Sequence, residues 1–231
     1  MKLAIIPARG GSKRIPNKNI ISFCGKPMIS YAIDAAKKSN IFDHIHVSTD
    51  SKEIAKIAEK QGCPVDFFRD DSLADDFTGL RPVMQWVVEK YAQRGQVYDE
   101  ICCIPPCSPL LQYSDIVSAF RIFEEDGKKK PLLVFAKYPV SIDWAFISSN
   151  DGMMHAKKPK MLLERSQDLD EYYYECGTFS IWDKKKLYDE STFSEGVLSY
   201  ILPADRAIDI DTMEDLERAK RMYKIIYGNK N

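Results

Sequence analysis

The chain opens with Lys2-Leu3-Ala4-Ile5-Ile6-Pro7-Ala8-Arg9-Gly10-Gly11-Ser12. The apolar run at residues 3–6 has the length of a buried strand, and it leads directly into a loop with two adjacent glycines. Parallel α/β sheets bind their ligands at the carboxyl ends of their strands, which is where this loop stands. The opening stretch therefore predicts an α/β fold with a ligand site at the end of its first strand.

Apolar runs alternate with helical stripes through the first 135 residues. We expect strands at residues 3–6, 45–49, 65–68, 101–104 and 132–135, with a helix after each of the first four. Pro27 is expected at the first position of the first helix, and Asp50 or Ser51 caps the second. This alternation predicts a doubly wound, mostly parallel sheet of the Rossmann type, with helices on both faces.

The pattern changes at about residue 139. From there to about residue 176 the helical stripes stop, and aromatic residues, lysines and prolines mix. We interpret residues 139–176 as an excursion from the sheet, a hairpin arm, within a single domain of residues 1–231. Strands resume at residues 178–182 and 198–202, and helical spacing predicts a last helix over about residues 213–227.

Composition excludes several classes of protein. Of 231 residues, 45% are hydrophobic and 29% are charged, which excludes a disordered chain, a collagen and a coiled coil. The net charge of −1 lacks the basic field of nucleic-acid binders. No apolar run approaches the ~18 residues of a membrane span, so no membrane partner is expected. None of the six cysteines forms a C-x-x-C pair, which favours a reducing compartment, and we expect the cytoplasm.

The first loop is strongly basic. Six basic residues and no acidic residue precede Asp34: Lys2, Arg9, Lys13, Arg14, Lys18 and Lys26. Gly10 and Gly11 let the backbone approach a ligand closely, and lysine and arginine supply charge to a phosphate chain. The spacing fits neither the G-x-x-x-x-G-K-[ST] loop nor the G-x-G-x-x-G fingerprint. We predict a phosphate site; the alternative is a solvated basic loop.

Two aspartates near the C-terminus form a second candidate site. In Ile208-Asp209-Ile210-Asp211-Thr212, residues two apart share a face if the segment is extended. Asp209 and Asp211 then face one way while the isoleucines enter the core. Two neighbouring carboxylates stay ionised when a cation compensates them, and oxygen ligands favour Mg²⁺. The alternative, that Asp211 only caps the last helix, leaves Asp209 without a role.

A basic loop and a carboxylate pair together are the parts of a nucleoside triphosphate site, with a metal that neutralises developing charge. Two further stretches are candidates. Residues 69–78 follow the third expected strand and could contact a base or ribose, or form a capped polar loop. Residues 165–169 contain an arginine that could pair with a carboxylate, or that is an ordinary surface residue.

The order of these blocks resembles a known family. The chain carries Ile6-Pro7-Ala8-Arg9-Gly10-Gly11-Ser12-Lys13-Arg14-Ile15-Pro16-Asn17-Lys18-Asn19, then Gly25-Lys26-Pro27-Met28, Val47-Ser48-Thr49-Asp50, Leu73-Ala74-Asp75-Asp76, Ser108-Pro109-Leu110 and Ile208-Asp209-Ile210-Asp211-Thr212. Nearly the whole chain is similar to the CMP-sialic acid synthetases, the acylneuraminate cytidylyltransferases. Arg165-Ser166-Gln167-Asp168-Leu169 resembles the subgroup that activates pseudaminic acid.

The resemblance implies a fold like the nucleotide-diphospho-sugar transferases and a reaction in which the C2 hydroxyl of a nine-carbon sugar acid attacks the α-phosphate of CTP. The implied nucleotide-binding residues are Arg9, Gly10, Ser12, Lys13, Lys18, Asn19, Arg69 and Thr78. The implied catalytic residues are Lys18, Asp211 and Arg9. Asp209 and Asp211 would bind Mg²⁺, and the sugar would be contacted by Arg165, Gln167 and Tyr174. The arm is similar to the family's dimerisation arm, which implies a homodimer.

The sugar side departs from the family pattern. Pro105 stands where sialate enzymes have a glutamine, and Tyr174 replaces a histidine of the pseudaminate pattern. N-acetylneuraminic or legionaminic acid is therefore an alternative acceptor, and Kdo a more distant one. A module that binds CTP or a CMP-sugar without turnover is the alternative of another class. The glycine spacing argues against a nicotinamide oxidoreductase.

Overall fold

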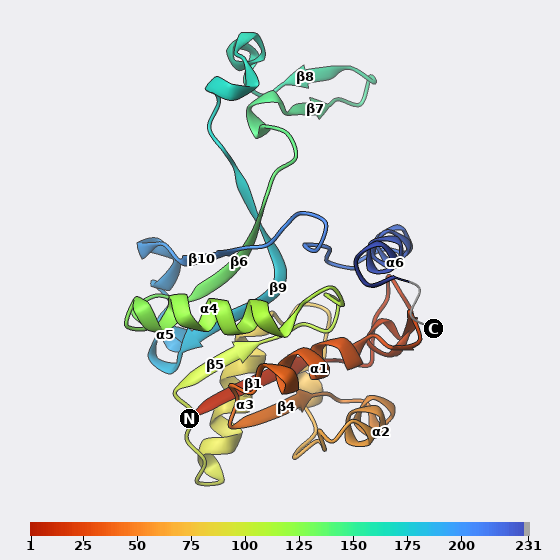
Figure 1. Cartoon of the computed structure of the whole chain (residues 1–231), viewed down its shortest axis with the longest axis vertical. Helices are drawn as coiled ribbons and strands as arrows, with labels where there is room; N and C mark the ends of the chain where they lie inside the picture. The colour runs from red at the N-terminus through yellow and green to blue at the C-terminus, as the bar shows by residue number, and fades with distance from the viewer. Residues whose placement is uncertain (229–231) are drawn as a thin grey trace.

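A six-stranded sheet forms the centre of the computed structural model, which describes residues 1–228 (Figure 1). Its strands run in the order β10-β6-β9-β5-β1-β4. Their bounds are β1 (Lys2–Pro7), β4 (His44–Ser48), β5 (Glu100–Cys103), β6 (Leu132–Lys137), β9 (Tyr173–Asp183) and β10 (Leu198–Ile201). Only β9 among them runs antiparallel to its neighbours, β5 and β6. The predicted mostly parallel sheet is therefore confirmed.

The first strand is buried on both faces, as its uninterrupted apolar run predicts. Ala4 and Ile6 point into one core and Leu3 and Ile5 into the other, because successive side chains of a strand alternate. Helices cover both faces: α1 (Ile29–Ser39), α2 (Lys52–Lys60) and α4 (Tyr113–Glu125) contribute to the first core, and α3 (Leu80–Gln93) and α5 (Lys184–Tyr188) to the second. Figure 1 shows α4 and α3 on opposite sides of the sheet.

The last helix packs on neither of these cores. α6 (Met213–Tyr227) has the bounds that its apolar spacing predicts. Leu216 and Ala219 pack with Ile208, Ile210 and Phe23 in a third core beside the first loop. This packing brings the C-terminal aspartates next to the N-terminal basic loop.

Pro27 is not the first residue of a helix. It pairs with Ser22 across a short hairpin of β2 (Ser22–Phe23) and β3 (Lys26–Pro27), and α1 begins at Ile29. The two turn residues, Cys24 and Gly25, both have positive φ, the backbone that a two-residue hairpin turn requires. The second helix starts as predicted, because the Ser51 hydroxyl accepts a hydrogen bond from the amide of Ile54 at 3.4 Å.

The predicted strand at residues 65–68 is wrong, and β4 is the edge of the sheet. Phe67 stacks on His46 with ring centroids 4.5 Å apart and lies against Trp86 of α3. Asp66 accepts hydrogen bonds from His44 and the Tyr91 hydroxyl. The segment thus packs the half-buried Phe67 beside the sheet, without a backbone ladder to β4, while Phe68 is 47% exposed.

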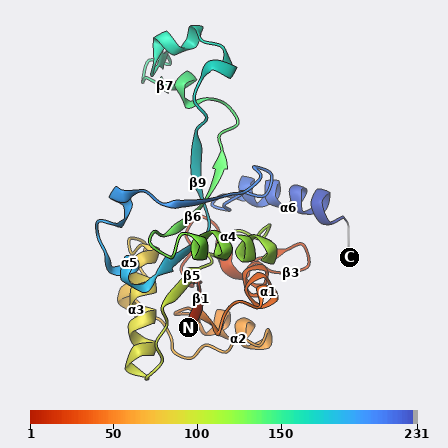
Figure 2. The same cartoon turned by 60° about the vertical axis from the view of Figure 1, so that its left-hand side comes forward.

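An arm projects from the sheet between β6 and β9 (Figures 1 and 2). It holds the hairpin of β7 (Phe146–Ser148) and β8 (Met154–Ala156) and three short 3₁₀ helices, η3 (Ile142–Trp144), η4 (Pro159–Leu163) and η5 (Ser166–Asp168). The remaining 3₁₀ turns are η1 (Lys18–Ile20), η2 (Asp71–Leu73) and η6 (Thr192–Glu195). Within residues 1–228, no helix has the length and apolar character needed to span a bilayer.

Candidate functional site

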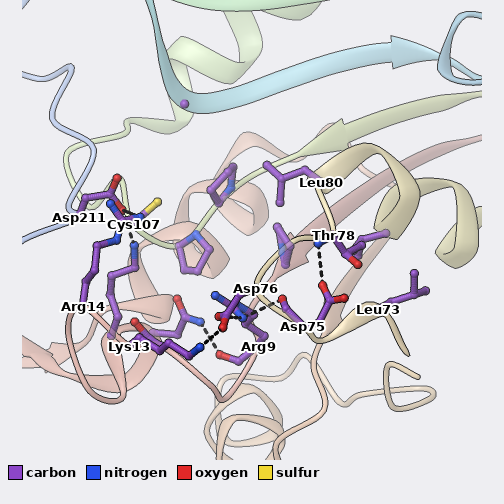
Figure 3. A pocket seen from close by; sticks show the side chains of 18 of the residues that line it. Arg9, Lys13, Arg14, Leu73, Asp75, Asp76, Thr78, Leu80, Cys107 and Asp211 are labelled. Carbon is purple, nitrogen blue, oxygen red and sulfur yellow. Dashed lines mark hydrogen bonds and ion pairs between the residues drawn. The ribbon is translucent and has the colours of Figure 1, made fainter. Parts of the chain in front are cut away.

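A pocket of about 730 Å³ opens at the carboxyl ends of β1 and β5 (Figure 3). The basic loop after β1 forms one wall and the loop between residues 69 and 80 forms another. The segment after β5 and the aspartates before α6 complete it. Nine of the sequence-predicted site residues line this pocket: Arg9, Ser12, Lys13, Lys18, Asn19, Arg69, Thr78, Asp209 and Asp211.

Gly10 is placed differently from the prediction. Its amide donates a hydrogen bond to Asp50 Oδ1 at 2.8 Å, so the amide serves the fold. A Cβ at this position would lie 3.1 Å from the Cβ of Ser51, the N-cap of α2. Gly10 therefore allows the loop to approach α2 closely and does not itself line the pocket.

The basic loop is closed by one of its own side chains. Asn19 is buried, and its Nδ2 donates to the carbonyl oxygen of Arg9 at 2.9 Å. This bond joins the two ends of the stretch between residues 9 and 19. It holds the loop as a unit, with Lys13 and Lys18 facing the pocket.

Asp211 is paired with two cations of this loop. Arg14 Nη2 lies 2.8 Å from Asp211 Oδ1, and Lys18 Nζ lies 3.1 Å from the same oxygen. Lys18 also donates to the carbonyl oxygen of Ile210 at 2.8 Å. The ammonium of Lys18 thereby fixes the C-terminal segment to the loop across 193 positions of sequence.

Asp209 shares the pocket with Asp211, as the alternation of the segment predicts. Ile208 and Ile210 are 4% and 0% exposed, while both aspartates face the pocket. The surrounding protein raises the pKa of Asp209, mainly by desolvation and also through the charge of Asp211, while the nearby Cys107 side chain lowers it. A divalent cation would offset this unfavourable charge.

The two aspartates fit a Mg²⁺ ion. Carboxylate oxygens are the ligands that Mg²⁺ prefers, and proteins often supply one or two of them and leave the remaining positions to water and substrate phosphates. Within residues 1–228 no cluster of three or more His, Cys, Asp or Glu side chains could hold a metal. Asp209 and Asp211, which both line the pocket, are therefore residues that could hold such an ion together with a phosphate chain.

Arg69 is a buried cation at the pocket wall. It is 6% exposed, and its guanidinium donates to the hydroxyl and the carbonyl oxygen of Ser48 at 3.0 and 2.7 Å. Burial lowers the pKa of this guanidinium, while the charge of Asp50 raises it. Because both bonds go to the last residue of β4, the cation is held rigidly at the sheet edge.

The loop of residues 70–79 is attached to the basic loop by ion pairs. Arg9 Nη1 lies 2.7 Å from Asp76 Oδ1 and donates to the carbonyl oxygen of Asp75 at 2.8 Å. Lys13 pairs with the other oxygen of Asp76. These hydrogen bonds, that of Lys13 first, lower the pKa of Asp76. Asp75 accepts from the amide of Thr78 at 2.7 Å, which shapes the turn (Figure 3).

The three predicted sugar-binding residues do not line this pocket within one chain. Arg165 and Gln167 lie on the arm at η5, where Arg165 pairs with Asp168 at 2.8 Å and is largely exposed. Gln167 lines a smaller hollow at the base of the arm. Tyr174 lies in β9 with its ring against Tyr138 at 5.1 Å. Figure 2 shows that the arm extends away from the body of the chain.

Sequence reasoning missed several residues of the pocket. Arg14 and Asp76 lie in charged stretches in which no single residue stands out. Their ion pairs are formed with residues far away in the sequence, so a local sequence pattern does not reveal them. Gly177 had a detectable signal, because a lone glycine within a strand pattern often marks a bulge. Its φ is +62°, and a Cβ there would lie 3.3 Å from Asp209 Oδ2.

Comparisons with known proteins show the family of the chain. A sequence model of the family described as Cytidylyltransferase matches residues 3–226. The chain is 38% identical over 224 residues to a pseudaminic acid cytidylyltransferase of Campylobacter jejuni, with 96% of each chain covered. It is 32% identical to a CMP-N,N'-diacetyllegionaminic acid synthase of Legionella pneumophila, again with 96% of each chain covered.

A solved structure has a similar fold. It is described as CMP:2-keto-3-deoxy-manno-octonic acid synthetase complexed with CTP. Its TM-score is 0.73 at 14% identity, over 97% of this chain and 99% of that one. At this identity the likeness concerns the fold alone.

Proposed function

The chain belongs to the cytidylyltransferase family, and from this premise we propose that it transfers CMP from CTP to the C2 hydroxyl of a nine-carbon sugar acid. Pseudaminic acid is the proposed acceptor, supported by the 38% identity to an enzyme named for that substrate. Legionaminic acid follows, because a relative named for it is 32% identical. We propose that residues 1–231 are one catalytic domain with an inserted arm; the arm was predicted at about residues 139–176, and it ends earlier because β9 joins the sheet from Tyr173.

One observation carries the proposal: a cationic loop and a carboxylate pair face each other in a single pocket. In this proposal Arg9, Lys13 and Lys18 supply charge to the triphosphate, and Arg69 and Thr78, which line the same pocket, contact the nucleoside. The pocket volume of about 730 Å³ lies within the range of about 300–1,000 Å³ that is usual for small-molecule sites.

The reaction forms one bond and breaks one. The oxygen of the sugar hydroxyl bonds to the α-phosphorus, and the bond from that phosphorus to the oxygen bridging to the β-phosphate breaks. Pyrophosphate leaves with the electron pair, and the hydroxyl proton passes to water. Negative charge grows on the leaving group, where fixed cations stabilise it without reorganising. We assign this role to Lys18 and Arg9, and the hydrogen bond of Lys18 to Ile210, which restrains its ammonium, supports the assignment.

Asp209 and Asp211 would hold Mg²⁺, which when bound neutralises charge on the phosphate chain. A metal held by Asp211 would compete with Arg14 and Lys18, which pair with this carboxylate in the structure. The two cations then become available to the phosphates. Loss of either carboxylate should therefore impair turnover more than folding.

We propose that the arm forms the interface of a homodimer. The arm carries exposed apolar side chains, which mark interaction surfaces when they gather: Val140, Phe146, Ile147, Met153, Met154 and Leu163. It also carries Arg165 and Gln167 out of reach of their own pocket. We place the protein in the cytoplasm, which supplies CTP and keeps thiols reduced; all six cysteines are free.

The testing experiment measures pyrophosphate release from CTP and Mg²⁺ with four separate acceptors: pseudaminic, legionaminic and N-acetylneuraminic acids, and Kdo. Rapid release with pseudaminic acid alone is the expected result. Preference for another acid would overturn the choice of sugar and leave the reaction class intact. CTP binding without release for every acceptor would favour a non-catalytic module, and Pro105 in the pocket wall would be the first residue to revert to glutamine.

A further inference from the structure

The pocket already contains a carboxylate at the place where phosphate would be bound. Asp76 lies between Arg9 and Lys13 of the basic loop. One of its carboxylate oxygens is 2.7 Å from Arg9, and the other is paired with Lys13 (Figure 3). A phosphate oxygen would seek the same donors, because both groups are anionic acceptors with several oxygens. In the free pocket these donors are therefore engaged by the protein itself.

We propose that Asp76 is an internal counter-ion that competes with the substrate and product phosphates for Arg9 and Lys13, and thereby speeds the release of pyrophosphate. The inference rests on the proposed function, which makes pyrophosphate the leaving group. When an anion enters, the two cations turn to it and Asp76 is displaced. When pyrophosphate leaves, Asp76 returns to the cations and makes rebinding less favourable.

The exposure of the three side chains suits a displaceable contact. Asp76 is 29% exposed, Arg9 31% and Lys13 82%, so water screens both ion pairs. Exposed pairs are weak, and a weak pair yields to a polyanion that makes more contacts. A fully buried pair at this position would block the substrate.

The loop can release Asp76 without losing its shape. Its turn is held by Asp75, whose carboxylate accepts from the amides of Phe77 and Thr78 at 3.0 and 2.7 Å. Neither bond involves Asp76. Displacement of Asp76 thus breaks its two ion pairs with the basic loop, whereas the turn that carries Thr78 and the bond from Arg9 to the carbonyl oxygen of Asp75 at 2.8 Å do not depend on the Asp76 carboxylate.

The first test titrates the 231-residue protein with inorganic pyrophosphate and measures the binding affinity by calorimetry. Asp76→Asn should bind pyrophosphate roughly three- to tenfold more tightly than the wild type, the range expected for one or two exposed ion pairs. Asp76→Glu, which keeps the charge, should stay within about twofold of the wild type. Unchanged or weaker binding by Asp76→Asn would overturn the proposal, since Asp76 would then position the cations and not compete for them.

A matched control separates a local contact from a change in total charge. Glu53→Gln removes the same charge from the exposed first turn of α2, next to the basic loop but outside the pocket wall. Its pyrophosphate affinity should match the wild type, and an equal gain in both variants would refute a specific role for Asp76. Asp76→Ser gives the same comparison if the asparagine variant does not fold.

Kinetics then connect the contact to turnover. In Asp76→Asn the inhibition constant for pyrophosphate and the KM for CTP should both fall, roughly three- to tenfold, while kcat falls or stays level. A rise in both constants would contradict competition. Because the titration uses pyrophosphate alone, it remains informative if no acceptor supports turnover, and so it distinguishes failure of this inference from failure of the proposed function.

Discussion

Gly177 allows a strand to pass close to a proposed metal ligand, and Gly177→Ala tests that geometry. The backbone there has φ +62°, where an alanine costs about 1–2 kcal/mol. For a chain of this size, that loss lowers the Tm by roughly 2–8 °C. The new Cβ would also lie 3.3 Å from Asp209 Oδ2, closer than ordinary contact, so Asp209 or β9 must shift.

The shift should appear in catalysis more strongly than in stability. A misplacement of about 1 Å can cost about a hundredfold in rate, so a shift of a few tenths of an ångström should lower turnover by up to roughly tenfold. We also expect the Mg²⁺ concentration for half-maximal turnover to rise, because Asp209 is a proposed ligand. The assay is pyrophosphate release across a Mg²⁺ series, beside thermal unfolding of the same preparation.

Gly95→Ala is the matched control. Gly95 has φ +79°, and a Cβ there would meet nothing within 4 Å. It should lose comparable stability and keep wild-type turnover and Mg²⁺ dependence. If Gly177→Ala loses stability but keeps both, the close approach to Asp209 does not matter for the metal, and the reasoning is refuted.

Four further outcomes are expected. Asp211→Asn should lose roughly a hundredfold or more in turnover with little change in Tm; wild-type turnover would remove Asp211 from the proposed metal site. Arg206→Met breaks a buried bidentate pair with Asp115, whose shorter bond is 2.5 Å, and should cost about 3–5 kcal/mol in urea unfolding; a loss below 1 kcal/mol would contradict this. Since the pKa of Asp209 is raised, protons compete with Mg²⁺ at higher pH than for an ordinary aspartate, so the Mg²⁺ concentration for half-maximal pyrophosphate release should increase as pH falls; a requirement independent of pH would contradict this. Ile147→Glu on the exposed arm hairpin should convert the proposed dimer to a monomer by light scattering; an unchanged mass would place the interface elsewhere.

The elements of the sheet were predictable because their signals are local. The apolar run at residues 3–6 and the stripe of the last helix each fix a period and a length, and both appear where expected. Residues 65–68 show the limit of such reasoning. Their composition suits a strand, but a strand also needs a neighbouring strand for backbone hydrogen bonds. In the structure Phe67 instead stacks on the ring of His46.

The pocket was predictable in part. The basic loop and the aspartate pair are each visible as unusual charge. Position after the first strand of a parallel sheet predicts that the basic loop faces the carboxyl edge. The aspartates were joined to it only through the chemistry of a triphosphate site. Asp76 and Arg14 were not singled out, because their importance lies in partners far away in the sequence. The resemblance supplied Arg165 and Gln167, but a single chain carries them on the arm, outside its own pocket.

The bond from Asn19 to the carbonyl of Arg9 has a consequence for how this protein can change over evolutionary time. It joins the two ends of the basic loop, so residues 10–18 lie in a loop that this hydrogen bond closes. Substitutions between Arg9 and Asn19 should alter the charge that the loop presents to the pocket. The two ends of the loop should keep their positions next to β1 and η1. A loop closed in this way can change its ligand preference by substitution without a change in the sheet. The residues needed for folding are then separate from the residues that can vary.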